Sequence, residues 1–477
     1  MDLVPKPDQV VAAAGNVAHK LLYGGIADLR PMPRSLVDEG KLTTKLAQQV
    51  ATAVLSNNVI VHHRFMDIRK EQATVTITLA AGNLLETDAD RGVANAAGLA
   101  WSRPATSKLS SSDIEDLMVG KKVNVNGGVG MDAMTLVVSG NPAELEEGLK
   151  LAHLMLTDPV IEAPALEQWK KDELRQIESR KTDPRGAMAE AMAEPMYPGV
   201  DSRVRPLTAE QVNRVTLEAA QSWLRNAIAT APIEVGVVGD IKMEQARDLV
   251  ARYVGSLAKR ERISPSTLDN LRSIAKVPGP RSIVREIKTA TPLAMAVNGF
   301  YGADIENVFD SRCLQMASRV LSTRMIQKVR EQEQLAYSPQ CAHRAATDFP
   351  GFGLFISAMP TQPEKLDRLV TVVDEIYSTF AASGPTEEEM ATVRKQIANA
   401  LDEQMKDPGL WNARLAVLDH PPAKLDDTLN SRGGQQTYTA QQIKDVFTKY
   451  YKPESQLKLV VKPAAAGGAE GDKPAAQ

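Results

Sequence analysis

The sequence predicts an α+β fold of two homologous domains, each a mostly antiparallel sheet with helices packed on one face. Two observations lead to this prediction: a long internal repeat, and the order of strands and helices within each copy. Strands connected as hairpins and followed by grouped helices form an antiparallel sheet that the helices cover. A repeat of roughly 200 residues is too long for a solenoid and therefore indicates duplicated domains.

The repeat consists of four collinear pairs of segments. In the first pair an apolar strand runs into a polar turn and an amphipathic helix, and in the second a long amphipathic helix stops before Asp-Pro. A stop there is expected because proline disfavours helical backbone in the residue before it. The last two pairs are a short helix and a final strand. The paired segments are 134–156 with 352–377, 166–184 with 388–408, 207–215 with 438–446, and 233–239 with 457–461.

These pairs set the expected domain limits. We expect an N-terminal extension or linker over residues 1–45, a first domain over 46–255, a charged and proline-punctuated linker over 256–281, and a second domain over 282–463. Residues 464–477 are a low-complexity run of Ala, Gly, Pro and Lys, which cannot bury a core and is expected to be a disordered tail.

Composition excludes several classes of protein. A formal net charge of −3 over 477 residues gives no electrostatic case for nucleic acid or an anionic membrane. There is no apolar run of 18 residues, so we expect a soluble chain without a membrane span. The N-terminal segment carries charges where a signal peptide needs an apolar stretch. Either the chain is not exported by that route or it is a piece of something longer, and cytoplasm and periplasm both stay open.

Cysteine and histidine give no metal motif. Cys313 and Cys341 are too few for a disulfide framework or a cysteine-based zinc site. No histidine has a His or Glu partner at the helical spacing of a metal site. His62 and His63 are adjacent on a predicted strand, where one side chain is expected to be buried and the other exposed, in packing roles. The histidines are His19, His62, His63, His153, His343 and His420.

Two short glycine-containing stretches need an interpretation. Residues 127–130, GGVG, lie between predicted strands and are expected to form a hairpin turn, being too short to hold a phosphate. Residues 90–101, DRGVANAAGLAW, follow a strand and predict a helix of small residues with Asp88 as its possible N-cap. Between Arg91 and Trp101 this helix offers no histidine, carboxylate or thiol.

Residues 318–340, SRVLSTRMIQKVREQEQLAYSPQ, resemble the second-domain signature of the pitrilysin/insulinase family of zinc peptidases. That signature reads small-Ser-Arg-Leu, then Arg-Glu, then Leu-Ala-Tyr-Ser. The resemblance covers roughly residues 45–463 and implies one half of a clam-shell peptidase, in which two such halves close around a peptide. The matching residues are Ser322, Arg324, Arg330, Glu331, Leu335, Ala336, Tyr337 and Ser338.

The same resemblance locates a zinc motif that this chain lacks. The family's first domain reads close to Gly-Val-Ala-His-Leu-Leu-Glu-His, and this chain matches at Gly-Val-Ala and then departs. Asn95 stands at the first ligand, Gly98 at the base and Leu99 at the second ligand. A catalytic zinc needs three protein ligands and a carboxylate that accepts a proton from the bound water. We therefore expect no metal on this chain and a zinc on its partner. Glu173 and Glu178, on the long helix where a third ligand would originate, are expected to be solvated.

Arg330 and Tyr337 are the candidate catalytic and substrate-binding residues. We expect Arg330 near the end of a helix and Tyr337 at the start of the next strand, so that both tips reach one spot. A guanidinium and a phenol can donate to the oxyanion of a tetrahedral intermediate or to the peptide backbone. The resemblance implies that they act in trans, on a peptide held at the partner's zinc. The alternative is structural, with Arg330 at a helix dipole and Tyr337 as an ordinary strand residue.

Two functions are consistent with these residues and with the resemblance. The first is a non-catalytic half or subunit of a zinc metalloendopeptidase, inactive alone, whose partners are a homologous H-x-x-E-H subunit or N-terminal half and unfolded peptides. The second is a proteolytically inactive scaffold or assembly subunit of the same family. A peptide-binding protein that acts alone is a third possibility. Arg324 is expected to have a structural role, and Glu331 and Glu333 to be solvated charges.

Overall fold

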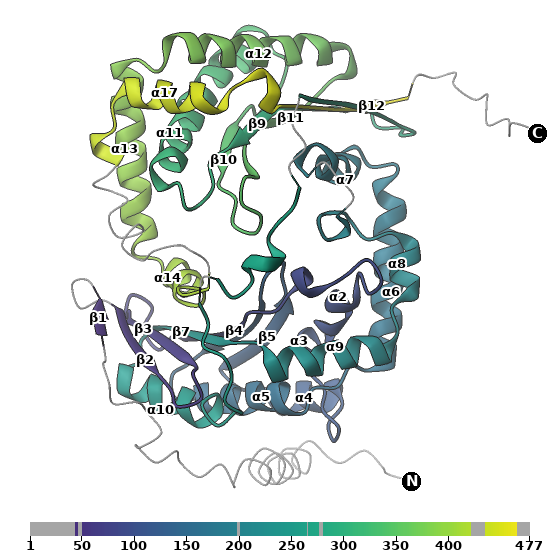
Figure 1. Ribbon diagram of the computed structural model, residues 1–477, viewed down its shortest axis with the longest axis vertical. Helices are drawn as coiled ribbons and strands as arrows, with labels where there is room; N and C mark the ends of the chain where they lie inside the picture. Colours follow the sequence, from purple (N-terminus) through teal and green to yellow (C-terminus); the bar gives the residue numbers. More distant parts are fainter. Residues whose placement is uncertain are drawn as a thin grey trace, which may run out of the picture. The chain divides into compact units, whose positions relative to one another are not determined.

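The computed structural model describes residues 43–45, 50–197, 201–264, 266–275, 280–420 and 435–464. The expected N-terminal extension and C-terminal tail lie almost wholly outside these residues. The chain forms two compact units, each built around one sheet (Figure 1). Unit 1 comprises Met1–Asp172, Ala209–Arg272 and Asn399–Asn430, and unit 2 comprises Glu173–Thr208, Ser273–Ala398 and Ser431–Gln477.

The predicted fold class is confirmed, since each unit contains a mixed sheet with packed helices. In the seven-stranded sheet of unit 1 the order is β1–β2–β3–β7–β4–β6–β5, and only the β3–β7 pair is parallel among the described strands. The strands are β1 (Thr43–Lys45), β2 (Val50–Val54), β3 (Ile60–Phe65), β4 (Ala73–Leu79), β5 (Val123–Val129), β6 (Met134–Gly140) and β7 (Ile233–Gly239).

One face of this sheet forms the main core of unit 1. Alternate strand residues such as Val61, Ile77 and Val235 pack against apolar side chains of the helices, including Leu149 and Leu249. The helices of this region are α2 (Val93–Ala97), α3 (Leu99–Ser102), α4 (Ser111–Met118), α5 (Leu145–Thr157), α6 (Ala163–Arg180), α8 (Ala209–Arg214), α9 (Leu217–Thr230) and α10 (Met243–Tyr253).

Unit 2 contains a five-stranded sheet in the order β10–β11–β9–β12–β8, with β8 and β12 parallel. Its helical face is aromatic, and the rings of Phe300 and Phe355 stack with centroids 4.7 Å apart. The strands are β8 (Arg281–Ile287), β9 (Ala294–Gly302), β10 (Cys341–Arg344), β11 (Gly353–Thr361) and β12 (Gln456–Pro463). The helices are α11 (Val308–Met325), α12 (Leu366–Ser383), α13 (Glu387–Gln404) and α17 (Ala440–Tyr450), and a π-helix, Ile326–Gln332, continues α11.

Each sheet also receives a short helix from the other copy of the repeat. In unit 2, α7 (Pro184–Met196) packs on β12, β8 and β9, and Met188 contacts this apolar face. In unit 1, α14 (Pro408–Leu415) packs on β7, β3 and β4, and Trp411 and Leu415 are its buried anchors. Thus the two copies exchange equivalent helices.

The Asp-Pro pairs start these exchanged helices. Asp183 caps α7 by accepting a hydrogen bond from the backbone N–H of Gly186 at 2.6 Å, and Asp407 caps α14 by accepting from Gly409 at 3.1 Å. Proline fits the first helical position, where its missing N–H has no intrahelical partner to lose. The contiguous domain limits inferred from the repeat stay a prediction. The compact units differ from them because each exchanged helix packs on the other sheet.

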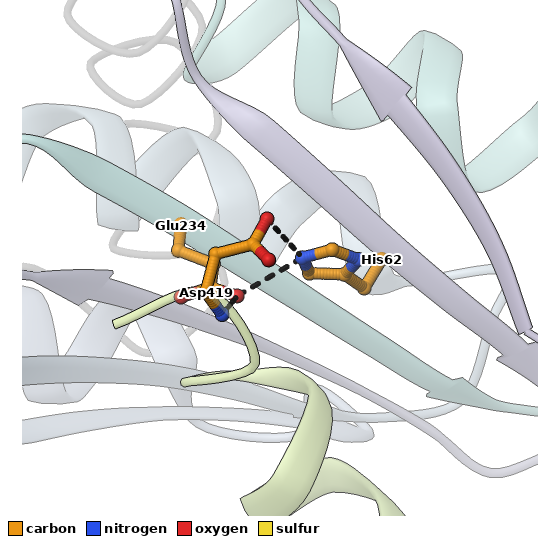
Figure 2. A group of neighbouring side chains, drawn as sticks. All are labelled: His62, Glu234 and Asp419. Carbon is orange, nitrogen blue, oxygen red and sulfur yellow. Dashed lines mark hydrogen bonds and ion pairs between the residues drawn. The ribbon is translucent and has the colours of Figure 1, made fainter. Parts of the chain in front are cut away.

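The exchange explains why the prediction for His62 and His63 is wrong. Both side chains are buried, at 2% and 4% exposure, because α14 covers one face of β3 and α10 the other. The Nε2 atom of His63 lies 2.8 Å from the carbonyl oxygen of Ile241. On the opposite face, His62 points at Glu234 and Asp419 (Figure 2). A strand covered on both faces buries successive residues alike.

Candidate functional site

The helix of small residues packs closely on the edge strand β5. It is divided into α2 and α3 at Gly98, and Trp101 of α3 is fully buried. A Cβ on Gly127 would lie 3.1 Å from the Cβ of Trp101 and 2.6 Å from the carbonyl oxygen of Thr135. Glycine is needed there because the helix and strand approach so closely. The expectation of a turn over residues 127–130 is therefore wrong: β5 continues to Val129.

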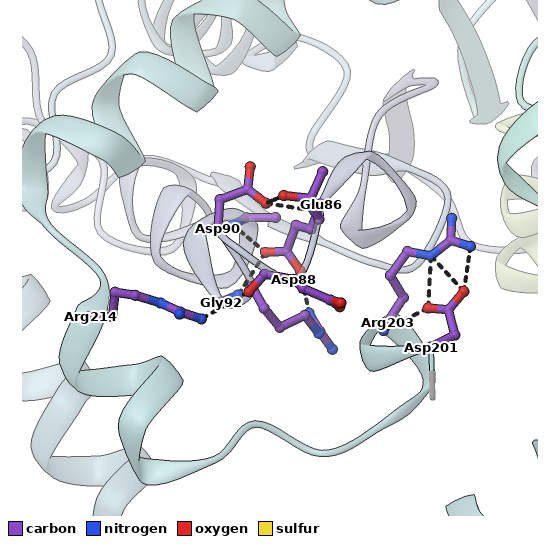
Figure 3. Close-up of polar contacts among 10 residues, drawn as sticks. Glu86, Asp88, Asp90, Gly92, Asp201, Arg203 and Arg214 are labelled. Atoms are coloured by element: carbon purple, nitrogen blue, oxygen red, sulfur yellow. Dashed lines mark hydrogen bonds and ion pairs between the residues drawn. The ribbon is translucent and has the colours of Figure 1, made fainter. Parts of the chain in front are cut away.

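The start of α2 is held by Glu86, and Asp88 is not the N-cap (Figure 3). The Glu86 carboxylate accepts hydrogen bonds from the backbone N–H groups of Gly92 at 3.0 Å and Ala94 at 2.7 Å, and it pairs with Arg91. Gly92 has a φ of 98°, a left-handed conformation that suits glycine. Burial raises the pKa of Glu86, although Arg91 and the two amides act in the opposite direction. The carbonyl of Asp88 instead accepts from Arg214 at 2.9 Å.

The three positions compared with the zinc motif carry no ligand chemistry. Asn95 and Leu99 are half-buried, and the Oδ1 atom of Asn95 is buried without a hydrogen-bond partner in the ranges that the structure describes. A Cβ on Gly98 would lie 3.3 Å from the Cγ2 atom of Val129, tighter than ordinary contact. These three positions supply an amide but no imidazole and no carboxylate. On α6, Glu178 is exposed and paired with Lys181, as expected of a solvated charge.

Arg330 and Tyr337 lie side by side, with Arg330 near the end of a helix as expected but Tyr337 outside any strand. Arg330 is in the last turn of the π-helix, and Tyr337 is in the following loop, since β10 begins only at Cys341. The guanidinium carbon of Arg330 is 4.8 Å from the centroid of the Tyr337 ring, within the range of a cation–π contact. Tyr337 is 78% exposed. Among the described residues, neither polar group makes a hydrogen bond or an ion pair.

An open hollow of about 780 Å³ lies beside this pair. Its walls come from the end of the π-helix, the loop that carries Tyr337, the end of β11 and the turn before α12. Lining residues include Leu293, Arg330, Ala336, Tyr337, Pro360 and Gln362. A hollow lined by apolar side chains together with a few polar groups is the form in which proteins commonly bind peptides and small molecules.

The loop between Arg330 and Tyr337 is fixed by three anchors. The Thr361 hydroxyl donates to the carbonyl of Leu335 at 2.6 Å, and the Lys365 ammonium donates to the carbonyl of Gln334 at 3.0 Å. Arg368 of α12 pairs with Glu333, and this pairing, through its hydrogen bond, holds the pKa of Glu333 below its usual value. Thus Glu333 is an anchor rather than the free surface charge that we expected. No local pattern signals these anchors, because the partners lie about 30 residues further along the chain.

Arg324 has the structural role expected of it. Its guanidinium donates to both carboxylate oxygens of Glu389, at 2.7 and 2.8 Å, and to the carbonyl of Gly384 at 2.9 Å. Burial alone would raise the pKa of Glu389, but the hydrogen bonds from Arg324 hold it below its usual value. These contacts fasten the end of α11 to the start of α13 within unit 2.

Comparison with known proteins fits this geometry. Residues 214–397, which include Arg330 and Tyr337, match the family model described as the peptidase M16 inactive domain. Residues 214–397 therefore resemble a domain of the M16 peptidase family. Over 365 residues it is 22% identical to the probable zinc protease PqqL of Escherichia coli (strain K12), covering 76% of this chain and 38% of PqqL. The resemblance to the pitrilysin family is therefore confirmed, and the chain spans less than half of that relative.

Solved structures of M16 proteins share the fold. A peptidase M16 inactive domain from Pseudomonas fluorescens matches with a TM-score of 0.75 at 17% identity, over 87% of this chain and 99% of that one. The periplasmic protease PqqL from Escherichia coli matches with a TM-score of 0.73 at 19% identity, over 90% of this chain and 47% of that one. Within the described residues, no helix is both long enough and apolar enough to cross a membrane.

Proposed function

We propose that this chain is the non-catalytic half or subunit of a zinc metalloendopeptidase. It closes over a peptide held at the zinc of an H-x-x-E-H partner and contributes Arg330 and Tyr337 in trans. The observation that carries the proposal is the contact between these two exposed donors at the rim of an open hollow. Asn95, Gly98 and Leu99, which cannot bind zinc, support a role that depends on a partner. The M16 inactive domain and the likeness to part of PqqL support the same conclusion.

The chemistry of the pair suits the transition state of peptide hydrolysis. Attack of water on the scissile carbonyl places negative charge on its oxygen, and donors already in position stabilise that charge most effectively. Arg330 can supply several N–H donors and Tyr337 one O–H donor. The cation–π contact holds the guanidinium near the ring without using a hydrogen-bond donor. The anchored loop keeps both tips in place before the substrate arrives, so little ordering is left for the catalytic step.

Reconstituted cleavage tests the proposal. The purified chain is mixed with an H-x-x-E-H homologue, and hydrolysis of an unfolded peptide is followed for the wild type, Arg330→Ala and Tyr337→Phe. We expect no cleavage by this chain alone and a loss of roughly 100- to 1,000-fold in kcat for each variant, the usual effect of removing one oxyanion donor. Arg344→Ala, which removes an exposed arginine on β10, is the matched control and should cleave normally.

Two further variants separate charge from geometry. Arg330→Lys keeps the charge but loses the planar donor set, and Tyr337→Ala removes the ring that faces the guanidinium. Because the two side chains touch, the double variant should lose less activity than the two single losses combined. Cleavage by the chain alone would contradict the proposal. Cleavage by the pair that is unchanged in both donor variants would favour the scaffold function.

A further inference from the structure

Three polar side chains from distant parts of the sequence meet on the face of the unit 1 sheet that α14 covers. His62 lies on β3, Glu234 on β7, and Asp419 follows α14 (Figure 2). The Nε2 atom of His62 is 2.9 Å from Oε1 of Glu234 and 3.5 Å from Oδ2 of Asp419. One potential ligand atom from each residue lies within 4.8 Å of the other two. The three residues form a compact donor set with one nitrogen and two oxygen ligands.

Burial makes the charge of this cluster a problem. The side chains of His62 and Glu234 are 2% and 0% exposed, and that of Asp419 is 39% exposed. The fully buried Glu234 carboxylate beside a neutral imidazole is strongly unfavourable unless a cation lies close to it. Arg64, two residues further along the same face of β3, lies over the Trp411 ring at 3.5 Å. Within the described residues it makes no ion pair with the cluster. A cation at the cluster, whether a proton on His62 or a bound metal ion, would stabilise the buried Glu234 carboxylate.

Unsatisfied atoms point to the same place. Oε1 of Glu234 accepts a hydrogen bond from the backbone N–H of Asp419 at 2.7 Å, but Oε2 of Glu234 is buried and has no hydrogen-bond partner among the described residues. Thr78, directly opposite Glu234 on β4, also has a buried hydroxyl for which the described part of the chain offers no hydrogen-bond partner. Buried polar atoms are nearly always satisfied, so two unsatisfied oxygens beside a donor set indicate a ligand-binding position.

We propose that His62, Glu234 and Asp419 bind a divalent transition metal ion, with Zn²⁺ as the probe. Zinc lies about 2.0–2.1 Å from nitrogen and oxygen ligands, which places tetrahedral ligand atoms about 3.3 Å apart. The observed separations of 2.9 and 3.5 Å bracket that spacing. An imidazole in the set favours a transition metal over Mg²⁺ or Ca²⁺. A divalent ion also brings the charge of the cluster to zero.

A neighbouring hydroxyl prepares the imidazole for this role. The Oγ1 atom of Thr52 is 2.9 Å from Nδ1 of His62. When Nδ1–H donates to this hydroxyl, Nε2 presents its lone pair to the two carboxylates, as in the outer-shell contacts of metal-binding histidines. The metal links Asp419, which follows α14, to His62 on β3 and Glu234 on β7. Its role is structural, because His62 and Glu234 are too deeply buried for a peptide to reach, so the chain alone is still expected not to cleave.

Metal titration tests the site. The chain is stripped with a chelator and titrated with Zn²⁺ in competition with a chromophoric chelator, and the bound zinc is counted by elemental analysis. We expect one tightly bound Zn²⁺ per chain, no comparable binding of Mg²⁺, and binding at least about 100-fold weaker in His62→Asn and Glu234→Gln. His63→Asn is the matched control, because His63 is equally buried on the same strand but faces the opposite side.

Asp419→Asn is the decisive variant if the two buried variants fail to fold. Its side chain is partly exposed, so folding should survive while one anionic ligand is lost. Circular dichroism establishes that each variant is folded before the titration. Wild-type protein that binds no stoichiometric Zn²⁺ would overturn the proposal, and so would equal affinity in wild type and Asp419→Asn. In either case the cation of the cluster would be a proton on His62.

Discussion

Replacing Gly236 by alanine should disturb the packing of α14 on the unit 1 sheet. Gly236 lies on β7, opposite His62 of β3, on the face that α14 covers. A Cβ there would lie 2.6 Å from the backbone nitrogen of Ala416 and 2.8 Å from the carbonyl carbon of Leu415. Ordinary contact begins near 3.4 Å, so the backbone at the end of α14 must retreat by about 0.8 Å.

The size of the effect follows from how the helix responds. If α14 shifts as a body, overpacking costs about 1–3 kcal/mol of folding stability. If it detaches, the burial of Trp411 is lost, which for a large aromatic residue costs about 3–5 kcal/mol. Either response moves Asp419, four residues beyond Leu415, so the affinity for Zn²⁺ should fall as well. Gly128→Ala is the control, because a Cβ at that strand position meets nothing within 4 Å.

Two assays measure these effects. Urea unfolding followed by circular dichroism gives the change in the unfolding midpoint. The dependence of the unfolding free energy on urea concentration is compared as well, because a changed slope would indicate a change in the unfolding transition rather than in stability alone. Hydrogen exchange of a peptide covering residues 405–420 reports on α14 directly. We expect lower protection there in Gly236→Ala and wild-type protection in Gly128→Ala. Equal stability and equal exchange in the two variants would refute the close packing of α14 on Gly236.

Three further predictions concern His62, Arg324 and Thr361. In metal-free protein the Asp419 and Glu234 carboxylates raise the pKa of His62 although burial, the largest influence, lowers it. The stability that His62 adds relative to His62→Asn should therefore be present below its unfolded pKa and fall as pH rises through the raised folded value. Zn²⁺ binds only the neutral ring, so with Zn²⁺ the stability that His62 adds should instead grow with pH. Urea titrations from pH 5 to about 9, with and without Zn²⁺, distinguish these two pH dependences. Arg324→Ala should lower the free energy of unfolding by about 1–3 kcal/mol, measured with urea, because it breaks charge-assisted hydrogen bonds to Glu389. A change within experimental error would show that this pair does not stabilise the fold. Thr361→Val should leave the buried carbonyl of Leu335 unpaired and cost about 1–3 kcal/mol, with faster exchange in the loop before Tyr337, whereas unchanged exchange would show that this hydrogen bond does not hold the loop.

The sequence predicted the parts of the fold that depend on short stretches of chain. Short apolar segments paired by the repeat located the final strands β7 and β12, and amphipathic patterns located α5 and α12, since these signals come from neighbouring residues. The Asp-Pro pairs marked a helix boundary but carried no indication of which sheet the next helix would cover. That choice depends on apolar faces contributed by distant strands. For the same reason the prediction failed for His62, whose burial depends on α14.

At the candidate sites, the sequence identified some of the residues but not the contacts that position them. The family signature drew attention to Arg330 and Tyr337, but the π-helix and the anchored loop that bring them together depend on partners near residue 365. Glu86 was missed as the helix cap because it lies six residues before Gly92. The cluster of His62, Glu234 and Asp419 has no linear pattern at all. A search for helical metal spacing cannot find ligands that come from two strands and the segment after a helix.

The exchange of α7 and α14 has a consequence for synthesis of the chain on the ribosome. The sheet of unit 1 is complete once β7 has emerged, at residue 239, but the helix that covers its second face ends only at residue 415. Until then Val50, Met66 and Val238 have no cover, and exposed apolar strands of this kind are prone to aggregation. Unit 1 therefore completes its packing after most of unit 2 has been made. Chaperones that bind extended apolar segments should contact the nascent chain during this interval.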